Sequence, residues 1–165
     1  NGIKTGTERT IDGDLSDWGE LTQSTTSTRA ALATHLGVDG LYIAVKMTQA
    51  DITGDRNYTE GDCWKNQNLE FQATDTMYAA RVIMYNGQCY HTGGITDAAM
   101  TFVQNADGDD EWIVEMFIAN EAMKNVNSST ASVTMKLGGQ LFASTDAADA
   151  NVWNWYAENV PVNRA

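Results

Sequence analysis

The chain has little positive charge and few prolines or cysteines. Among its 165 residues, 10 are lysine or arginine and 22 are aspartate or glutamate, which gives a formal net charge of −12. A field of this sign repels phosphate backbones and anionic lipid headgroups, so we expect neither nucleic acid nor a membrane surface as a partner. No apolar run reaches the roughly 20 residues that a membrane-spanning helix needs.

Cys63 and Cys89 are the only cysteines. In an oxidising compartment they can form one disulfide, which would clamp the base of the loop around Trp64. Two separate buried thiols fit the sequence equally well, because pairing depends on geometry. The 14 glycines and the many Thr, Asn, Gln and Ser residues are typical of secreted bacterial β modules, which predicts an extracellular or bacterial cell-surface location.

Motifs of several common enzyme classes are absent. The sequence contains no Gly-x-Ser-x-Gly, P-loop or Gly-x-Gly-x-x-Gly pattern, which argues against hydrolase, NTPase and dinucleotide-binding functions. His35 and His91 lack the spacing of a zinc motif. A glycosidase needs two carboxylates that face each other across a cleft, and no second acid is marked as a partner of Glu70. We therefore expect a protein that is not an enzyme and requires no cofactor.

Alternating apolar and polar residues indicate short strands along most of the chain. The clearest example is a hairpin, in which residues 31–36 lead through a turn at 37–40 into the alternating residues 41–47. Further strands are expected at 69–73, 79–85, 88–91, 100–103, 112–118, 131–137 and 140–144. Gly138-Gly139 is expected to form a turn, and 120–124 one helical turn capped by Asn120. The pattern predicts a single domain, residues 1–165, with an all-β fold: an antiparallel β-sandwich of jelly-roll or immunoglobulin-like type with little helix.

Trp64 stands among polar residues at the end of a long loop, 48–68, directly before the strand that begins at Leu69. Leu69 and Glu70 point to opposite faces of that strand, so one face enters a core and the other carries hydrogen-bonding groups. An exposed indole beside a carboxylate and amides is typical of sugar binding, because a pyranose presents an apolar C–H face and a rim of hydroxyls. The alternative is that Trp64 folds back as a core residue.

The other tryptophans divide into two pairs. Trp153 and Trp155 are two residues apart on an extended segment, so both are expected on one side with Asn154 opposite. At least one of them is expected in the core, which leaves the other for a ligand. Trp18 and Trp112 occur in apolar alternation, and both are expected in the core.

Short motifs in a particular order carry a family resemblance. They are Ile11-Asp12-Gly13 with Trp18, Gly40-Leu41-Tyr42-Ile43-Ala44-Val45, Trp64 leading to Leu69-Glu70-Phe71, Val114-Glu115-Met116-Phe117-Ile118, and Leu137-Gly138-Gly139-Gln140-Leu141 followed by Trp153 and Trp155. Across nearly the whole chain they resemble family 9 carbohydrate-binding modules. The resemblance implies a β-sandwich that grips the end of a glycan chain between two tryptophans, one before the Leu-Glu-Phe strand and one near the C-terminus.

The resemblance also implies a set of ligand-binding residues. The set is Trp64, Glu70, Arg81, Gln140, Asn151, Trp153 and Trp155. Trp64 corresponds to the first clamp residue, and Glu70 to a carboxylate that bonds the sugar. Trp153 or Trp155 is the second clamp residue, and the pattern does not distinguish them. Arg81 takes the place of an arginine that has no direct match in this chain.

The resemblance makes a structural calcium plausible, and Asp12, Asp14 and Asp17 supply carboxylates near the start of the chain. The acidic turn 105–111 has the alternating oxygens of a calcium loop but lacks its later bidentate glutamate, because Met116 stands there. A solvated hairpin turn is therefore expected at this position.

The expected function is non-catalytic carbohydrate binding, as one module of a larger multidomain protein. Binding to chain ends of a polysaccharide would target an attached enzyme or a cell surface to the polymer. The family implies β-1,4 glucan or xylan, and starch-type α-1,4 glucan is the alternative ligand. Two other classes stay open: a haem-binding electron-transfer β-sandwich, which would use Met and His as axial ligands, and a protein-docking module of an extracellular assembly.

Overall fold

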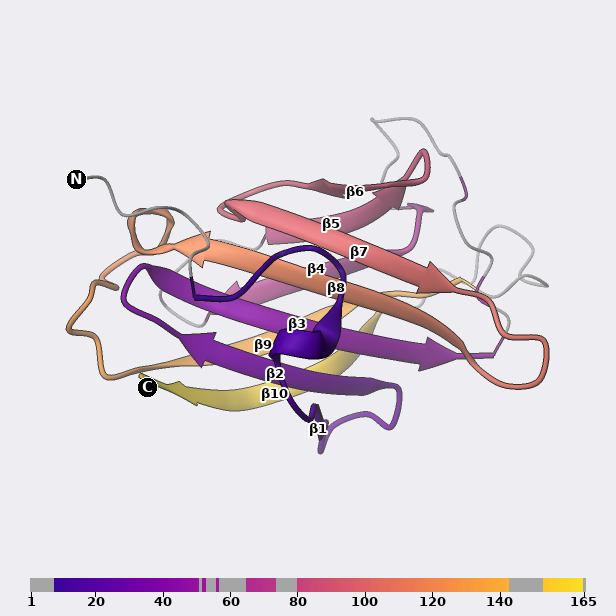
Figure 1. Cartoon of the computed structure of the whole chain (residues 1–165), viewed down its shortest axis with the longest axis horizontal. Helices are drawn as coiled ribbons and strands as arrows, with labels where there is room; N and C mark the ends of the chain where they lie inside the picture. Colours follow the sequence, from indigo (N-terminus) through magenta and orange to yellow (C-terminus); the bar gives the residue numbers. More distant parts are fainter. Residues whose placement is uncertain are drawn as a thin grey trace.

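The protein folds into two antiparallel sheets of five strands that face each other (Figure 1). The structure, a computed structural model, describes residues 8–50, 52, 56, 65–73, 80–142 and 153–164. The strand order is β1-β2-β3-β8-β7 in the first sheet and β10-β9-β4-β5-β6 in the second. The predicted all-β sandwich with little helix is confirmed. No helix among these residues is long and apolar enough to span a membrane.

The first sheet contains β1 (Thr22–Gln23), β2 (Ala30–Leu36), β3 (Gly40–Gln49), β7 (Asp97–Val103) and β8 (Asp110–Ala119). The second contains β4 (Asn68–Ala73), β5 (Ala80–Tyr85), β6 (Gln88–His91), β9 (Ser132–Gln140) and β10 (Asn154–Asn163). Among the described residues, the short 3₁₀ helix η1 (Leu15–Asp17) precedes β1, and a second one, η3 (Asn120–Ala122), follows β8.

The main core lies between the two sheets and is built from the inward-facing half of each strand. In β9, Val133, Met135 and Leu137 are buried while the residues between them are more exposed or face outward, as period-two alternation requires. Trp112, on β8, is fully buried in this core, as predicted. The hairpin of β2 and β3 also matches its prediction, because Ala31 pairs with Lys46 and Leu36 with Leu41.

The predicted turn at Gly138-Gly139 is wrong, because β9 continues through both glycines to Gln140. Gly138 is paired with Glu70 on one side and with Trp155 on the other. A Cβ atom at Gly138 would lie 2.5 Å from Cζ2 of Trp153. The glycine therefore provides room for packed indoles and does not reverse the chain.

One prediction about the chain after β8 also needs correction. Ala119 is the N-cap of η3 and Asn120 is its first residue. The side-chain amide of Asn120 donates instead to the carbonyl oxygen of Val38 at 2.7 Å. The final strand, β10, runs to Asn163 and includes Pro161, well beyond the extended segment around Trp153 and Trp155. Proline is compatible with this position because β10 is an edge strand.

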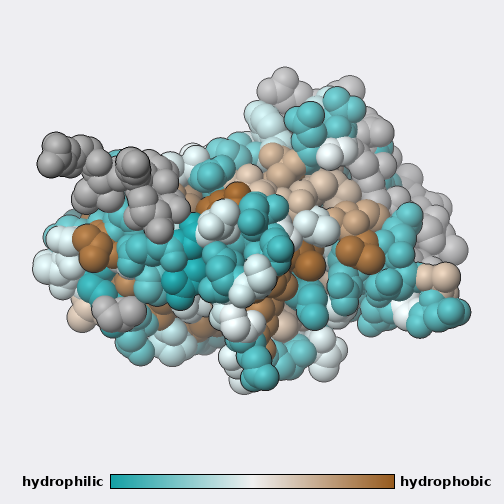
Figure 2. Space-filling model, viewed as in Figure 1, coloured by the Kyte–Doolittle hydropathy of each residue, from teal (hydrophilic) through white to brown (hydrophobic). Residues whose placement is uncertain are grey.

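The prediction that Trp18 lies in the core is wrong. Residues 8–20, which we call the N-terminal segment, cross the outer face of the first sheet (Figure 1), and the surface visible in this region is mainly hydrophilic with scattered hydrophobic residues (Figure 2). Trp18 is half-buried there and packs against a small cluster of Tyr42, Phe117 and Ala119, separate from the main core. Its indole N–H donates to Oε2 of Glu115 at 2.9 Å.

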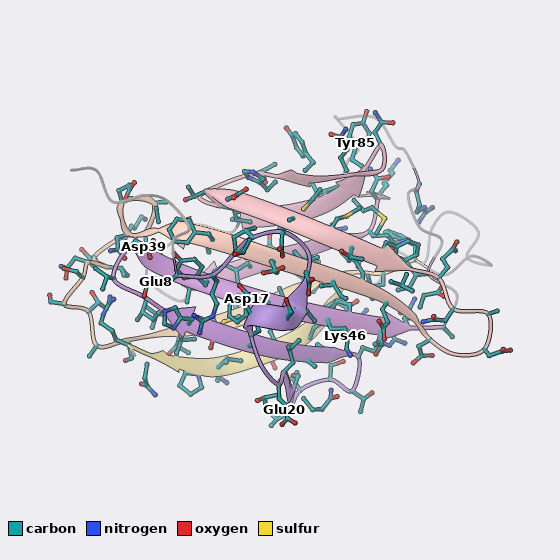
Figure 3. The ribbon with its side chains drawn as sticks, in the orientation of Figure 1. Glu8, Asp17, Glu20, Asp39, Lys46 and Tyr85 are labelled. Carbon is teal, nitrogen blue, oxygen red and sulfur yellow. The ribbon has the colours of Figure 1, made fainter. Side chains whose placement is uncertain are left out.

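Carboxylates anchor the N-terminal segment at two places. Glu8 and Asp39 lie next to each other (Figure 3), and His35 Nε2 is 3.1 Å from Oε1 of Glu8. Glu115 is fully buried, and its Oε1 has no hydrogen-bond partner among the described residues. Burial raises the pKa of Glu115 to about 7, and the neighbouring carboxylate of Asp12 also raises it, while the bond from Trp18 lowers it. A partly protonated carboxyl therefore lies under this segment near neutral pH.

We expect Trp112→Ala to lower the free energy of unfolding by about 3 to 5 kcal/mol, because it leaves a cavity in the main core. Urea unfolding followed by circular dichroism measures this. Tyr90→Ala is the control, since Tyr90 is 40% exposed on β6, and it should cost less than about 1 kcal/mol. Equal losses from the two substitutions would contradict the assignment of Trp112 to the core.

We expect Glu115→Gln to flatten the pH dependence of stability. The pKa of Glu115 is raised in the folded state, from 4.5 to about 7, so its contribution to stability is fully present below pH 4.5 and is lost as the pH rises through 7. The wild type should lose up to about 3 kcal/mol between pH 5 and pH 8 through this residue. Urea unfolding of both proteins at the two pH values gives the change in unfolding free energy with pH for each. Subtracting one change from the other removes the contribution of the other titrating groups, including Asp39. Identical pH slopes would refute the role of Glu115.

Candidate functional site

The outer face of the second sheet brings together five of the seven predicted ligand-binding residues. Strand pairing places Trp155 beside Gly138, Gly138 beside Glu70, and Glu70 beside Arg81, so these residues form one row across β10, β9, β4 and β5. Trp153 and Gln140 lie next to this row. We call this surface the tryptophan face, defined by Trp153, Trp155, Lys136, Gly138, Glu70, Gln72, Arg81 and Gln140.

The two tryptophans lie on the same side of β10, as their spacing predicts. Their ring centroids are 5.5 Å apart and their planes meet at 82°, an edge-to-face arrangement. Both rings rest on Gly138, where a Cβ atom would lie 2.5 Å from Trp153 and 2.9 Å from Cε3 of Trp155. Both indoles are half-buried and neither belongs to the main core, so the expectation that one of them is a core residue is wrong. The pair presents two nearly perpendicular aromatic surfaces.

Charged and amide side chains flank the indoles. Nη2 of Arg81 is 3.3 Å from Oε1 of Glu70, and Nε2 of Gln72 donates to Oε2 of Glu70 at 3.4 Å. The Glu70 and Arg81 side chains are 19% and 30% exposed, so both retain contact with solvent. Nζ of Lys136 lies 4.3 Å from the ring centroid of Trp155, within the range of a cation–π contact. These contacts hold the polar groups in place beside the aromatic surfaces.

Gln140 is held within the sheet surface instead of projecting from it. It is 8% exposed, and its Oε1 accepts from Nδ2 of Asn68 at 3.1 Å. Nearby, Gln67 and Phe142 exchange two hydrogen bonds between side chain and backbone. This buried amide network fixes the end of β9, and it leaves Gln140 less free to reach a ligand than the sequence predicts.

Two of the predicted ligand-binding residues, Trp64 and Asn151, lie outside the described residues, as does Cys63. Cys89 is a half-buried free thiol beside the main core, and burial raises its pKa to about 12. Lys136, Gln72 and Gly138 were not predicted as site residues. The usable signal for Gly138 and Lys136 was their spacing from Gln140, since residues two apart on one strand share a face.

Acidic residues proposed for calcium make other contacts. Asp14 accepts from the backbone N–H of Ser16 at 2.9 Å, and Asp17 from that of Thr10 at 2.8 Å, so both stabilise the turn around η1. In the acidic turn, buried Asp110 accepts from the backbone N–H groups of Asn105 and Ile52. Within the described ranges, no three His, Cys, Asp or Glu side chains are grouped so that they could hold a metal ion. A structural calcium stays a prediction.

The tryptophan face places aromatic and polar groups within reach of one another. Strands are about 4.8 Å apart, so the backbone of Trp155 and that of Glu70 are separated by ~10 Å across two strand spacings. A flat apolar ring can lie on one indole while polar groups at its rim reach Glu70, Arg81 or Lys136. The one carboxylate of this face is paired with Arg81.

We expect Gly138→Ala to displace the indoles, because the added methyl group has no room beneath them. The near-ultraviolet circular dichroism of the coupled tryptophans should change strongly, with a stability loss of about 1 to 3 kcal/mol. Gly108→Ala is the matched control, since a Cβ atom there meets nothing within 4 Å. An unchanged spectrum for Gly138→Ala would show that the indoles do not rest on this glycine.

No protein-family model matches the chain, and no curated protein matches it either.

Proposed function

We propose that this chain is a non-catalytic carbohydrate-binding module whose ligand lies on the tryptophan face. One observation carries the proposal: Trp153 and Trp155 both rest on Gly138, and Trp155 lies in the same row across the strands as Glu70 and Arg81. Aromatic surfaces held next to planar groups that donate and accept hydrogen bonds meet the two chemical faces of a pyranose. The sequence resemblance to family 9 modules, from which these site residues were chosen, implies the same function.

The perpendicular indoles give the two rings different roles. Because their planes meet at 82°, a flat sugar can stack on one indole while the other indole contacts its edge. Lys136 lies over the Trp155 ring at 4.3 Å. Trp153 is therefore the better candidate for stacking, since Lys136 competes for a face of Trp155. Glu70 and Arg81 then lie within the reach of hydroxyls on the same or the next sugar unit.

The expected affinity is weak. Stacking one pyranose face removes on the order of 100 Å² of apolar surface from water, worth about 2.5 kcal/mol per ring. Hydrogen bonds to Glu70 and neighbouring groups add ~1 to 3 kcal/mol, and ordering and association costs subtract from the total. A dissociation constant between micromolar and millimolar follows. Weak binding suffices for a module whose attachment to a larger protein raises the local concentration of its partner domains on a polymer.

The ligand we propose is the chain end of a β-1,4 glucan or xylan, with starch-type α-1,4 glucan as the alternative. The module would target an attached enzyme or a cell surface to the polysaccharide, in an extracellular setting. This targeting role needs no catalytic group, which agrees with the engagement of Glu70 by Arg81 and Gln72.

We expect Trp153→Ala to weaken binding of cello- or xylo-oligosaccharides by about 60-fold, the equivalent of ~2.5 kcal/mol of lost stacking. Isothermal titration calorimetry and affinity electrophoresis in gels that contain a soluble cellulose derivative, xylan or starch measure this. Trp155→Ala and Trp64→Ala belong in the same series, because the sequence predicts that one tryptophan from each end of the clamp contacts the sugar.

Glu70→Gln should weaken the same binding by about tenfold, whereas Glu121→Gln should leave it unchanged. Glu121 is an exposed residue of η3 and serves as the matched control for loss of one negative charge. Circular dichroism confirms that each variant is folded. Binding that survives both Trp153→Ala and Trp155→Ala at full strength would overturn the proposed site, and no binding to any of the three polymers would overturn the proposed function.

A further inference from the structure

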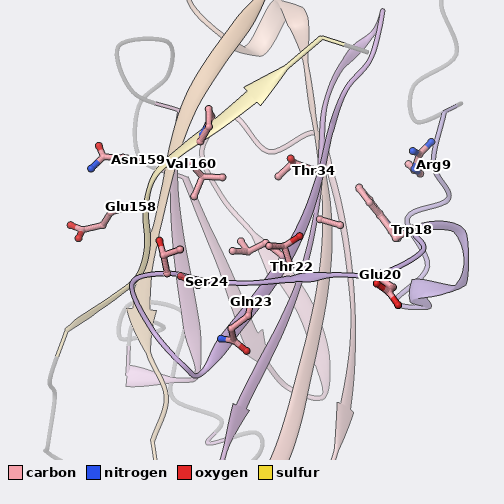
Figure 4. Close-up of a pocket in the computed structure, with 14 residues that line it drawn as sticks. Arg9, Trp18, Glu20, Thr22, Gln23, Ser24, Thr34, Glu158, Asn159 and Val160 are labelled. Carbon is pink, nitrogen blue, oxygen red and sulfur yellow. The ribbon is translucent and has the colours of Figure 1, made fainter.

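A groove of about 510 Å³ lies where the β1–β2 edge of the first sheet meets the edge strand β10 of the second (Figure 4). Leu32 and Val160 form its apolar part. Its polar groups come from four segments: the N-terminal segment, β1 with the residues after it, β2 and β10. Its volume lies within the range of small-molecule sites.

The edge of β2 is open at a single residue inside this groove. Backbone bonds between Gly37 and Gly40 and between Arg29 and Thr48 show that the odd-numbered residues of β2 bond to β3. The even-numbered residues therefore direct their N–H and C=O groups to the opposite edge. There, Leu32 pairs with β1 and Leu36 pairs with Arg164. Thr34, between them, is left to face the groove.

This edge is too short to accept a peptide strand. Strand addition needs a run of open backbone groups, and only one residue of β2 offers them between two occupied positions. On the facing wall, Pro161 of β10 has no N–H to contribute. The groove therefore suits a compact ligand that uses isolated hydrogen bonds.

Trp18 supplies a fixed aromatic wall. Its indole N–H is bound to buried Glu115, and the guanidinium of Arg9 lies 5.3 Å from the ring centroid. In Figure 4 the indole stands between Arg9 and the rest of the groove. The orientation of the ring is thus set before any ligand arrives, which lowers the ordering cost of binding.

Several polar side chains around the groove can form hydrogen bonds with a ligand. Glu20, Glu158 and Asn159 make no side-chain hydrogen bond within the described part of the chain and are exposed. Asn159 has a φ of 52° at an irregularity of β10, which turns it out of the regular strand. The hydroxyl of Thr34 also lines the groove. An aromatic wall with planar donors and acceptors around it matches the faces of a sugar ring.

We propose that this groove is a second saccharide site, which takes a neutral sugar of one or two rings. The lining contains two carboxylates, Glu20 and Glu158, against one cation, Arg9, on a protein with a net charge of −12. This charge disfavours phosphates and uronates. The site shares strand β10 with the tryptophan face, but none of the residues that define that face line the groove. If both sites bind sugar, as the proposed function requires of the tryptophan face, one molecule bridges two glycan segments.

The test is a ¹⁵N-resolved NMR titration with cellobiose, xylobiose and maltose as probes. It follows the Trp18 indole and Thr34 amide signals in the Trp153→Ala/Trp155→Ala double variant, in which the tryptophan face is disabled. We expect saturable shifts of both signals with at least one probe at millimolar concentration. Asn159→Gly combined with Thr34→Val should weaken this binding about fivefold or more, since each loses one hydrogen-bonding side chain.

Asn125→Gly is the matched control, because Asn125 also has positive φ, at 58°, and lies in an exposed turn after η3. It should leave the groove affinity unchanged. No shift at Trp18 and Thr34 up to about 50 mM of any probe would overturn the second site, whatever happens at the tryptophan face. If the Asn159→Gly/Thr34→Val variant binds the probe with the same affinity as the variant that keeps Asn159 and Thr34, the second site is overturned as well. Loss of binding at the tryptophan face alone would count against the proposed function only.

Discussion

The packing of apolar side chains between the two sheets is the interaction on which every other feature depends. Trp112 and the inward residues of β3, β4, β8 and β9 are removed from water there. Since side chains alternate along a strand, the residues between the buried ones project from the outer face of each sheet. The first sheet then carries the N-terminal segment on its outer face, and the second carries the tryptophan face. The core fixes which residues can share a surface.

Much of the fold could be predicted from local patterns, because alternation and turn residues are local properties. The hairpin of β2 and β3 and the shared side of Trp153 and Trp155 follow from spacing alone. The predictions are wrong at positions whose environment depends on a contact with a residue distant in sequence. Gly138 resembles a turn residue until two indoles from β10 are placed over it. Trp18 resembles a core residue because its partner, Glu115, is 97 positions away.

The candidate site was predictable to the extent that it lies on regular strands. Glu70, Arg81 and Gln140 were identified from the resemblance, and pairing of β4 with β5 and β9 places them on one face. Burial of Gln140 was not foreseen, because an amide network with Asn68 leaves no periodic signature. Lys136 is not predictable from the sequence, because an isolated lysine on a strand usually faces solvent and only the structure shows its contact with Trp155. Trp64 and Asn151 fall in segments outside the described residues.

The indole of Trp18 has one consequence that reaches across the first sheet. The hydrogen bond that the indole N–H donates to Glu115 fixes the orientation of this ring. The same ring forms a wall of the groove beside β10. A proton on Glu115 and a ligand in the groove would therefore act on the same indole from its two sides. By thermodynamic linkage, any effect of protonation on groove affinity must be matched by an equal effect of the bound ligand on the proton affinity of Glu115. Proton uptake on ligand addition, measured in buffers of different ionisation enthalpy, would report this coupling directly.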